Sequence, residues 1–374
     1  MPNFPPISVA LRLHARRRGV RTYGPECHYN GPMDPYNIRV AFIGCGGFAG
    51  RHGRHMSEIS EVRVVGLCDV SEVSLASFCD RVGGLDDVPR YDDHQKLLDQ
   101  VRPDAVVICT PHTLHCQHIV SSLEAGAHVL CQKPMVCTRA DARRVIAAAD
   151  RADRHVMISY QRHLIGQYLY GKHVLEAGQL GDVRYVTCRL AQDWIQLANR
   201  NPQPWRLDPK LSGGGQLMDS GSHMLDCVLW LIDLELDEVH AYQDNCGLEV
   251  DVQTAAACRF TNGALGTIAV LGDARGRGFM VYDDINIFCE HGELLLRNDV
   301  IMRRDGQADY YPIADEGLPD TVGPDLAFVQ LITDNRKINP APPQCGLRMA
   351  ELAEMIYLSA ELGRPVKITE LSDA

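Results

Sequence analysis

The sequence has no long apolar run and no excess of positive charge. No stretch of it approaches the roughly 18 consecutive apolar residues that a membrane span requires. The formal net charge is −11, so the chain as a whole has no bulk attraction for nucleic acid or for an anionic lipid surface. The lack of a long apolar run excludes a membrane-spanning helix. The lack of net positive charge predicts that the protein binds neither a membrane surface nor nucleic acid.

The chain also has no Cys-x-x-Cys pair, although it contains 14 cysteines. Cys68, Cys109 and Cys131 lie in or at the ends of apolar segments, where a free cysteine packs as a small hydrophobic residue. This placement does not indicate a disulfide framework. We therefore expect a reduced, cytoplasmic protein.

The first 36 residues differ in composition from the rest of the chain. Five arginines fall between Arg12 and Arg21, and no apolar segment follows them. That order argues against a secretory signal. We expect residues 1–36 to form a poorly ordered arm, as is common at chain ends.

From residue 38 onward, short apolar segments alternate with helical patterns. We expect strands at 38–43, 62–69, 104–109, 128–131 and 155–159, and helices at 48–58, 71–82, 93–101, 114–125 and 138–152. This alternation predicts an α/β domain over residues 37–160, built as a doubly wound parallel sheet.

After residue 160 the pattern becomes rich in strands. We expect strands at 182–192, 238–246, 252–260, 264–271, 281–289 and 292–297, with helices near 164–177, 219–232, 324–336 and 345–362. The turns at Asn262-Gly263 and His291-Gly292 favour hairpins. Residues 161–374 are thus predicted to form an α+β domain on an open antiparallel sheet of about five or six strands. Its C-terminal helix is a candidate to pack back on the first domain.

A glycine-rich turn follows the first predicted strand. Gly44 permits a tight turn, Gly46 lets the backbone approach a pyrophosphate, and the small Ala49 lets helix and strand pack closely. The amides at the start of the next helix would hold the phosphates. The second strand ends at Asp69, whose carboxylate would bind the ribose hydroxyls and repel a 2′-phosphate. The motif predicts an NAD site, with NADP less favoured.

Two further motifs carry candidate catalytic residues. Lys133 ends the fifth predicted strand and is one of six lysines in a chain with 31 arginines. A lysine there can hydrogen-bond a reacting hydroxyl. That Lys133 is an ordinary exposed loop residue is an equally good interpretation of the sequence. Asp219 and His223 are four residues apart, so one helix face would carry both. The carboxylate would orient the imidazole, which would act as a general base.

The same Asp219 and His223 pair could bind a metal, but no further ligands occur nearby at ligand spacing, so we expect none. His112, His115 and His118 are scattered near another helix start and are interpreted as surface or capping residues. Trp194 and Trp205 flank a polar segment; each is a candidate to stack on a sugar ring, although a structural anchor is the commoner role.

These motifs together resemble the Gfo/Idh/MocA oxidoreductase family over about residues 37–368. The resemblance is carried by the turn from Gly44 to Ala49, by Thr110 to His115, by Lys133-Pro134 and by the segment from Gly214 to Asp226. In one place the chain departs from the family pattern, because Gln132 occupies the position before the lysine where the family usually has glutamate.

The resemblance implies a Rossmann domain that binds NAD or NADP and an open-faced sheet that helps build the substrate site and often the oligomer interface. It implies a catalytic set of Lys133, Asp219 and His223. The cofactor-binding candidates are Gly44, Gly46, Gly47, Phe48, Ala49, Asp69, Thr110, Pro111, His115, Gln132 and Lys133. The substrate-binding candidates are Lys133, Arg162, Trp194, Trp205, Asp219 and His223.

The predicted function is oxidation of one secondary hydroxyl of a cyclic polyol, sugar or glycoside, with hydride transfer to NAD. Two alternatives stay open from the sequence. One is a redox-neutral enzyme that retains NAD and cleaves or rearranges a sugar. The other is a non-catalytic protein that senses a dinucleotide. We further expect a homodimer or homotetramer, because an open sheet face needs a cover.

Overall fold

The computed structural model describes residues 38–200, 205–275, 282–297, 300–304, 311–334 and 336–372. These residues all belong to one compact unit. The predicted arm over residues 1–36 lies outside them. None of the helices in the described ranges is long and apolar enough to cross a membrane.

Six parallel strands form the first sheet within the described residues, in the order β3-β2-β1-β4-β5-β6. The strands are β1 (Ile38–Ile43), β2 (Val62–Cys68), β3 (Arg90–Tyr91), β4 (Ala105–Ile108), β5 (His128–Cys131) and β6 (Val156–Ile158). This arrangement confirms the doubly wound parallel sheet. The strand order reverses between β1 and β4, which is the point at which such sheets bind ligands, beyond the carboxyl ends of the strands.

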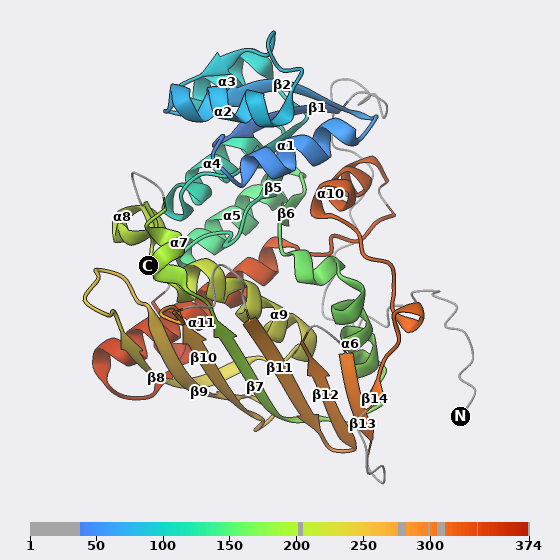
Figure 1. Ribbon diagram of the computed structural model, residues 1–374, viewed down its shortest axis with the longest axis vertical. Helices are drawn as coiled ribbons and strands as arrows, with labels where there is room; N and C mark the ends of the chain where they lie inside the picture. The colour runs from blue at the N-terminus through green and yellow to red at the C-terminus, as the bar shows by residue number, and fades with distance from the viewer. Residues whose placement is uncertain are drawn as a thin grey trace. The chain divides into compact units, whose positions relative to one another are not determined.

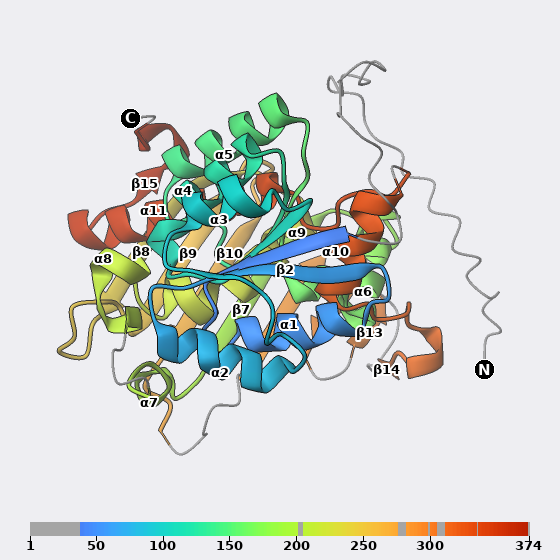
Figure 2. The ribbon, with the colours of Figure 1, turned by 90° about the horizontal axis from the view of Figure 1, so that it is seen from above.

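Helices cover both faces of this sheet (Figure 2). The helices α1 (Ala49–Glu58) and α2 (Glu72–Val82) lie on one face, and α3 (His94–Val101), α4 (His115–Glu124) and α5 (Arg139–Ala152) lie on the other. The side chains of Ser71, Asp93 and Thr138 cap the starts of α2, α3 and α5. All four residues of β4 are buried, which explains why these strands show no polar alternation.

The second sheet is larger than predicted. Within the described residues it has nine strands in the order β14-β13-β12-β11-β7-β10-β9-β8-β15. The strands are β7 (Val183–Ala191), β8 (Leu236–Asp244), β9 (Gln253–Phe260), β10 (Leu265–Leu271), β11 (Tyr282–Cys289), β12 (Gly292–Leu296), β13 (Val300–Arg304), β14 (Tyr311–Pro312) and β15 (Val366–Lys367). The expectation of five or six strands was wrong because it missed β13, β14 and β15, of which the last two have only two residues each and give no sequence pattern. The pair β7–β10 is parallel and every other pair is antiparallel, since β7 enters between β10 and β11.

Helices cover one face of this second sheet (Figure 1). They are α6 (Gly166–Glu176), α9 (Ser222–Ile232) and the long α11 (Pro343–Leu362). Residues of β9 alternate between buried and exposed, so its outward face carries no helix of the described chain. α11 also contacts α5, and α10 (Pro324–Thr333) packs against α1. The C-terminal part of the chain therefore returns to the first sheet, and Phe328 of α10 lies in its core.

One predicted helix begins differently from the expectation. The pattern indicated a helix over 219–232, but α9 begins at Ser222 and a single π-helical turn, Leu217–Gly221, precedes it. The Gly221 amide donates to the carbonyl of Gln216, five residues earlier. Such a turn inserts one extra residue and changes the direction of the side chains before it. Asp219 lies in this turn, and His223 lies after it.

Candidate active site

The glycine-rich turn has the geometry of a phosphate-binding loop. Gly44 has a φ of +86°, and an added Cβ would lie 2.6 Å from the carbonyl carbon of Cys109, so only glycine fits. An added Cβ on Gly46 or Gly47 would meet nothing within 4 Å. No side chain caps the start of α1, at Phe48, and its first turn holds no acidic residue. The loop backbone therefore borders open space at a helix N-terminus, where a pyrophosphate fits.

Two side chains hold this loop in place. Asp69 Oδ2 accepts from the Cys45 amide at 2.8 Å, and Asp69 Oδ1 accepts from the Ser71 amide at 2.9 Å. Arg81 of α2, which sequence reasoning missed, donates from Nη2 to the carbonyl of Gly46 at 3.0 Å. Asp69 stays partly exposed, and Val70 after it is 90% exposed. The carboxylate thus braces the turn and still borders solvent where a ribose would lie.

The segment after β4 has a different role from the one predicted for its histidines. His115 is fully buried, and its ring nitrogens lie 2.8 Å from the Pro134 carbonyl and 2.9 Å from the Thr110 carbonyl. It ties the end of β4 to the segment that carries the lysine, whereas the sequence suggested a cofactor contact. Thr110 contacts His118 at 3.0 Å, and Pro111 is half-buried beside it.

Lys133 and Asp219 meet although 86 residues separate them. Lys133 Nζ donates to Asp219 Oδ1 at 2.9 Å and to the Asp219 backbone carbonyl at 3.0 Å. The two side chains are 10% and 4% exposed, so the contact is a buried ion pair. The lysine is therefore not an exposed loop residue.

The other carboxylate oxygen of Asp219 has two donors. Trp194 Nε1 donates to Oδ2 at 2.9 Å, and Arg206 Nε donates to the same oxygen at 2.8 Å. Trp194 is fully buried, at the start of the short helix α7 (Trp194–Ala198). Of the two roles expected for Trp194, the indole contact fits the structural anchor, because the ring is buried and holds the carboxylate. The polar segment between the two tryptophans lies partly outside the described residues, from 201 to 204.

His223 lies in the same site, but its imidazole does not contact the carboxylate of Asp219. No hydrogen bond joins the two side chains in the described structure, because the π-turn directs Asp219 toward Lys133 and Arg206. Burial lowers the pKa of His223 well below its usual value, and the charges of Lys133 and Arg162 lower it further. A neutral imidazole results. Arg162 is half-buried and its guanidinium donates to the Tyr168 hydroxyl at 3.3 Å.

His112 is a residue of this site that sequence reasoning placed at the surface. It is 4% exposed, its Nδ1 lies 2.9 Å from the carbonyl of Ser212, and its Nε2 lies 3.9 Å from Asp219 Oδ1. Burial lowers its pKa to about 3. Neutral His112 donates from Nδ1, which leaves the Nε2 lone pair facing the ion pair. Its ring packs nearly perpendicular to that of Trp205, with centroids 4.8 Å apart.

The charges of the site fix its protonation. Burial alone would raise the pKa of the Asp219 carboxyl, but Lys133 and Arg206 outweigh it and hold that pKa well below its usual range. Burial lowers the pKa of Lys133, although the charge of Asp219 opposes the change. Arg206 lies over the half-buried ring of Trp205, 4.4 Å from its centroid. Trp205 thus borders the site, as the prediction of a substrate contact requires.

One group of side chains has ligating atoms of the kind that bind metals. The atoms of His163, Asp226 and Cys345 lie within 4.8 Å of one another. His163 Nε2 is 2.7 Å from Asp226 Oδ2, and its Nδ1 is 2.8 Å from the Pro340 carbonyl. Both ring nitrogens are therefore engaged, and we assign no metal to this group.

Comparison with known proteins defines the class. Residues 38–160 match the family model described as "Oxidoreductase family, NAD-binding Rossmann fold", and residues 168–295 match the GFO/IDH/MocA C-terminal domain. The chain belongs to the Gfo/Idh/MocA family of oxidoreductases with an NAD-binding Rossmann fold. This result confirms the family, the fold class and the NAD cofactor predicted from the motifs.

Two curated relatives indicate the chemistry within the family. The D-glucoside 3-dehydrogenase of Escherichia coli (strain K12) is 27% identical over 201 residues, which are 52% of this chain and 54% of that protein. The myo-inositol 2-dehydrogenase of Thermotoga maritima is 26% identical over 73% of this chain and 80% of that protein. The chain thus spans about half the length of the first relative and most of the second.

Solved structures show the same fold. Levoglucosan dehydrogenase in complex with NADH and levoglucosan has a TM-score of 0.77 and 20% identity, over 89% of this chain and all of that one. An aldose-aldose oxidoreductase from Caulobacter crescentus, complexed with glycerol, has a TM-score of 0.75 and 23% identity. It covers 88% of this chain and 99% of that chain.

Proposed function

We propose that this protein oxidises one secondary hydroxyl of a cyclic polyol, sugar or glycoside and passes the hydride to NAD. The observation that carries the proposal is the buried Lys133–Asp219 pair, which stands at the end of β5 close to His112 and His223. The relatives are dehydrogenases of a glucoside and an inositol, which supports this substrate class. They do not favour the redox-neutral alternative.

Each residue has a defined part in the proposed reaction. NAD, when bound, supplies the acceptor for the hydrogen that leaves the substrate carbon with its electron pair. Lys133 donates a hydrogen bond to the substrate oxygen and stabilises the negative charge that develops there. The neutral imidazole of His223 accepts the hydroxyl proton. Arg162 and Trp205 border the site and would contact the rest of the substrate.

The structure leads us to propose a different part for Asp219. The sequence suggested that it orients His223, but its carboxylate contacts Lys133, Trp194 and Arg206 instead. We therefore assign it to the lysine. It keeps the Lys133 ammonium in one place and opposes the loss of its charge on burial. The Trp194 indole holds Asp219 in turn, so Trp194 acts on Lys133 only through that carboxylate.

The preference for NAD over NADP is part of the proposal and rests on Asp69. Its carboxylate follows β2 beside the glycine-rich turn, where it would meet the ribose, and no basic residue directly follows it. A negative charge at that point disfavours a 2′-phosphate. Gly46, Gly47, Phe48, Ala49, Thr110, Pro111 and Gln132 would line the remainder of the cofactor site.

One assay tests the function directly. NADH formation is followed by absorbance while inositols, aldoses, anhydrosugars and glycosides are screened at saturating NAD. Stoichiometric NADH from one of these classes supports a dehydrogenase. Product formation without net NADH would favour the redox-neutral alternative. No reaction with any class, in a protein that binds NAD, would reject the proposed function.

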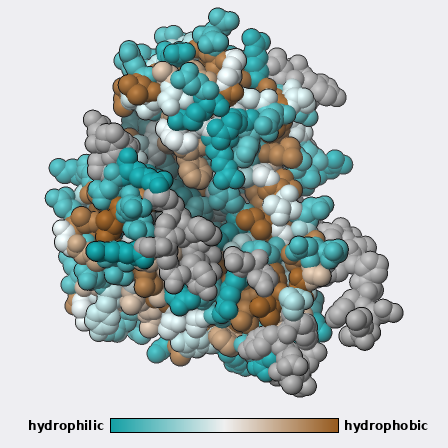
Figure 3. Space-filling view, in the orientation of Figure 1, coloured by the Kyte–Doolittle hydropathy of each residue, from teal (hydrophilic) through white to brown (hydrophobic). Residues whose placement is uncertain are grey.

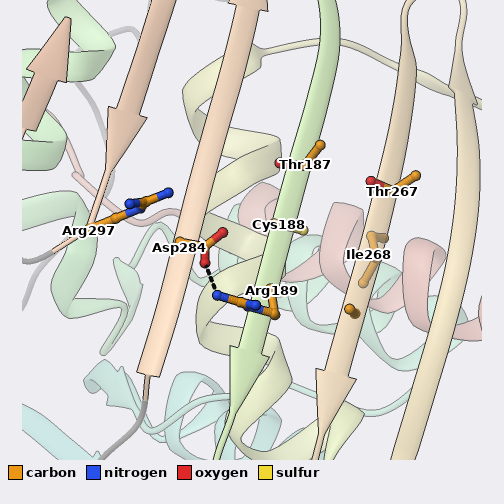
Figure 4. Close-up of a pocket in the computed structure, with 8 residues that line it drawn as sticks. Thr187, Cys188, Arg189, Thr267, Ile268, Asp284 and Arg297 are labelled. Carbon is orange, nitrogen blue, oxygen red and sulfur yellow. Dashed lines mark hydrogen bonds and ion pairs between the residues drawn. The ribbon is translucent and has the colours of Figure 1, made fainter. Parts of the chain in front are cut away.

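We also propose that residues 37–160 bind the cofactor, that residues 161–374 bind substrate, and that the second sheet forms a dimer or tetramer interface. Its outward face carries a pocket lined by Thr187, Arg189, Thr267 and Asp284, among others (Figure 4). The exposed apolar side chains on these strands include Tyr242, Leu265, Leu271 and Phe288. A second copy would cover them.

A cytoplasmic location is the last part of the proposal. The cysteines within the described ranges are all free, in keeping with a reducing compartment. On the face drawn in Figure 3, hydrophilic side chains surround smaller apolar areas.

A further inference from the structure

A buried polar chain leads away from the residue before the catalytic lysine. Gln132 is 7% exposed, and its Nε2 lies 2.5 Å from Nε2 of His52. His52 is 3% exposed, and its Nδ1 lies 2.6 Å from Oδ1 of Asp325, which is 1% exposed. The side chains of Gln132, His52 and Asp325 thus form one continuous chain of hydrogen bonds inside the protein. The proposed reaction uses neither His52 nor Asp325.

The contacts fix which atom carries each proton. The Asp325 carboxylate can only accept, so His52 carries a proton on Nδ1 and donates it to Asp325. When that is the only proton on the ring, Nε2 accepts from the Gln132 amide. A carboxylate behind an imidazole orients the ring and makes the opposite nitrogen a better acceptor. Asp325 thereby determines how firmly Gln132 is held.

The chain joins three elements that are far apart in sequence. Gln132 follows β5, His52 lies on α1, and Asp325 lies in the first turn of α10. α1 starts at the glycine-rich turn that would hold the pyrophosphate, whereas β5 leads into Lys133, where the proposed reaction places the nicotinamide. A rigid link between them sets the distance between the two ends of the cofactor site.

We propose that His52 and Asp325 are positioning residues for the cofactor, which they act on through Gln132. They hold the amide of Gln132 in one orientation beside Lys133 and keep α1 in register with β5. The inference rests on the proposed function only in placing NAD between the glycine-rich turn and Lys133. It needs neither the identity of the substrate nor turnover.

A measurement on the unmodified protein tests the proton arrangement. Nitrogen-15 NMR at mildly alkaline pH reports which imidazole nitrogen of His52 is protonated, with the His52→Gln spectrum used for assignment. A neutral ring with its proton on Nδ1 is expected. A proton on Nε2 would overturn the proposal, because Gln132 could not then donate to it.

A double-mutant cycle tests the role. His52→Leu and Gln132→Leu should each weaken NAD binding about tenfold, the loss expected of one strong hydrogen bond. The double variant should bind NAD no more weakly than Gln132→Leu alone, since His52 acts only through Gln132. NAD affinity is measured by titration without substrate. Additive losses, or an unchanged affinity in folded His52→Leu, would contradict the proposal.

His55 supplies a matched control. Its Nδ1 contacts the other oxygen of Asp325 at 3.0 Å, but it does not touch Gln132, and its side chain is 40% exposed. His55→Ala should therefore change NAD affinity much less than His52→Leu. Should His52→Leu fail to fold, Asp325→Asn takes its place. It keeps the shape of the carboxylate, and a several-fold loss of NAD affinity is expected. No loss would count against the proposal.

Discussion

Replacing Asp219 by Asn gives the sharpest test of the site. The substitution keeps the size of the side chain but removes its charge. Lys133, Trp194 and Arg206 all donate to the carboxylate. An Asn amide would turn a donor toward at least one of them, and the buried ammonium would lose its counter-ion.

The magnitude follows from the burial of the partners. Breaking a buried ion pair by removing one member costs about 3–5 kcal/mol of unfolding free energy. The Arg206 side chain is 30% exposed, so its ion pair with Asp219 contributes little to the free energy of unfolding, about 0–1 kcal/mol. For the reaction, losing a charge-assisted hydrogen bond that orients Lys133 costs about 1.5–3 kcal/mol. That corresponds to a fall in kcat/KM of roughly 10- to 150-fold.

The assay is NADH formation on the best substrate, with thermal unfolding measured on the same samples. Asp226→Asn is the matched control, because Asp226 is a buried carboxylate of α9 whose partner is His163 rather than the lysine. It should lose stability but keep most of the turnover of the folded protein. If folded Asp219→Asn kept near-normal kcat/KM, or lost no more than Asp226→Asn, the assignment of Asp219 to Lys133 would be refuted.

Four further outcomes are expected. Lys133→Ala and His223→Ala should each lower turnover by about 10²–10⁴, with a double variant that is less than additive, and normal turnover by folded His223→Ala would reject it as the base. Because burial lowers the pKa of Lys133 from 10.5, the alkaline limb of kcat/KM should lie below that pH. The charge of Arg206 contributes to this lowering, so Arg206→Met should move the limb to higher pH, and a shift to lower pH would contradict the assignment. Asp69→Ala should weaken NAD binding and reduce the preference for NAD over NADP. Tighter binding of NADP than of NAD by the unmodified protein would overturn the assignment of Asp69. Light scattering at micromolar concentration should give the mass of a dimer or tetramer, not of a monomer.

Local sequence determined the first domain almost completely. Five of the six parallel strands are short apolar runs, and α2 and α5 begin at the capping residues Ser71 and Thr138, so these boundaries follow from neighbouring residues. Gly44 is determined in the same way, because a positive φ and a close backbone approach admit no other residue. The candidate lysine also follows from its place at the end of a strand.

Tertiary structure decided what the side chains of the site contact. Asp219 and His223 have the spacing of a helical pair, yet a π-turn, which no sequence period marks, directs the carboxylate to Lys133. His112 and Trp194 became part of the site only because chain segments about 100 and 25 residues away fold against them. Such contacts depend on which elements pack together, as does the pairing of β15 with β8. The sequence by itself determined the longer helices, most of the longer strands and the cofactor class. Long-range packing decided the partners of each charge, because a buried charge takes the partners that the assembled fold brings within reach.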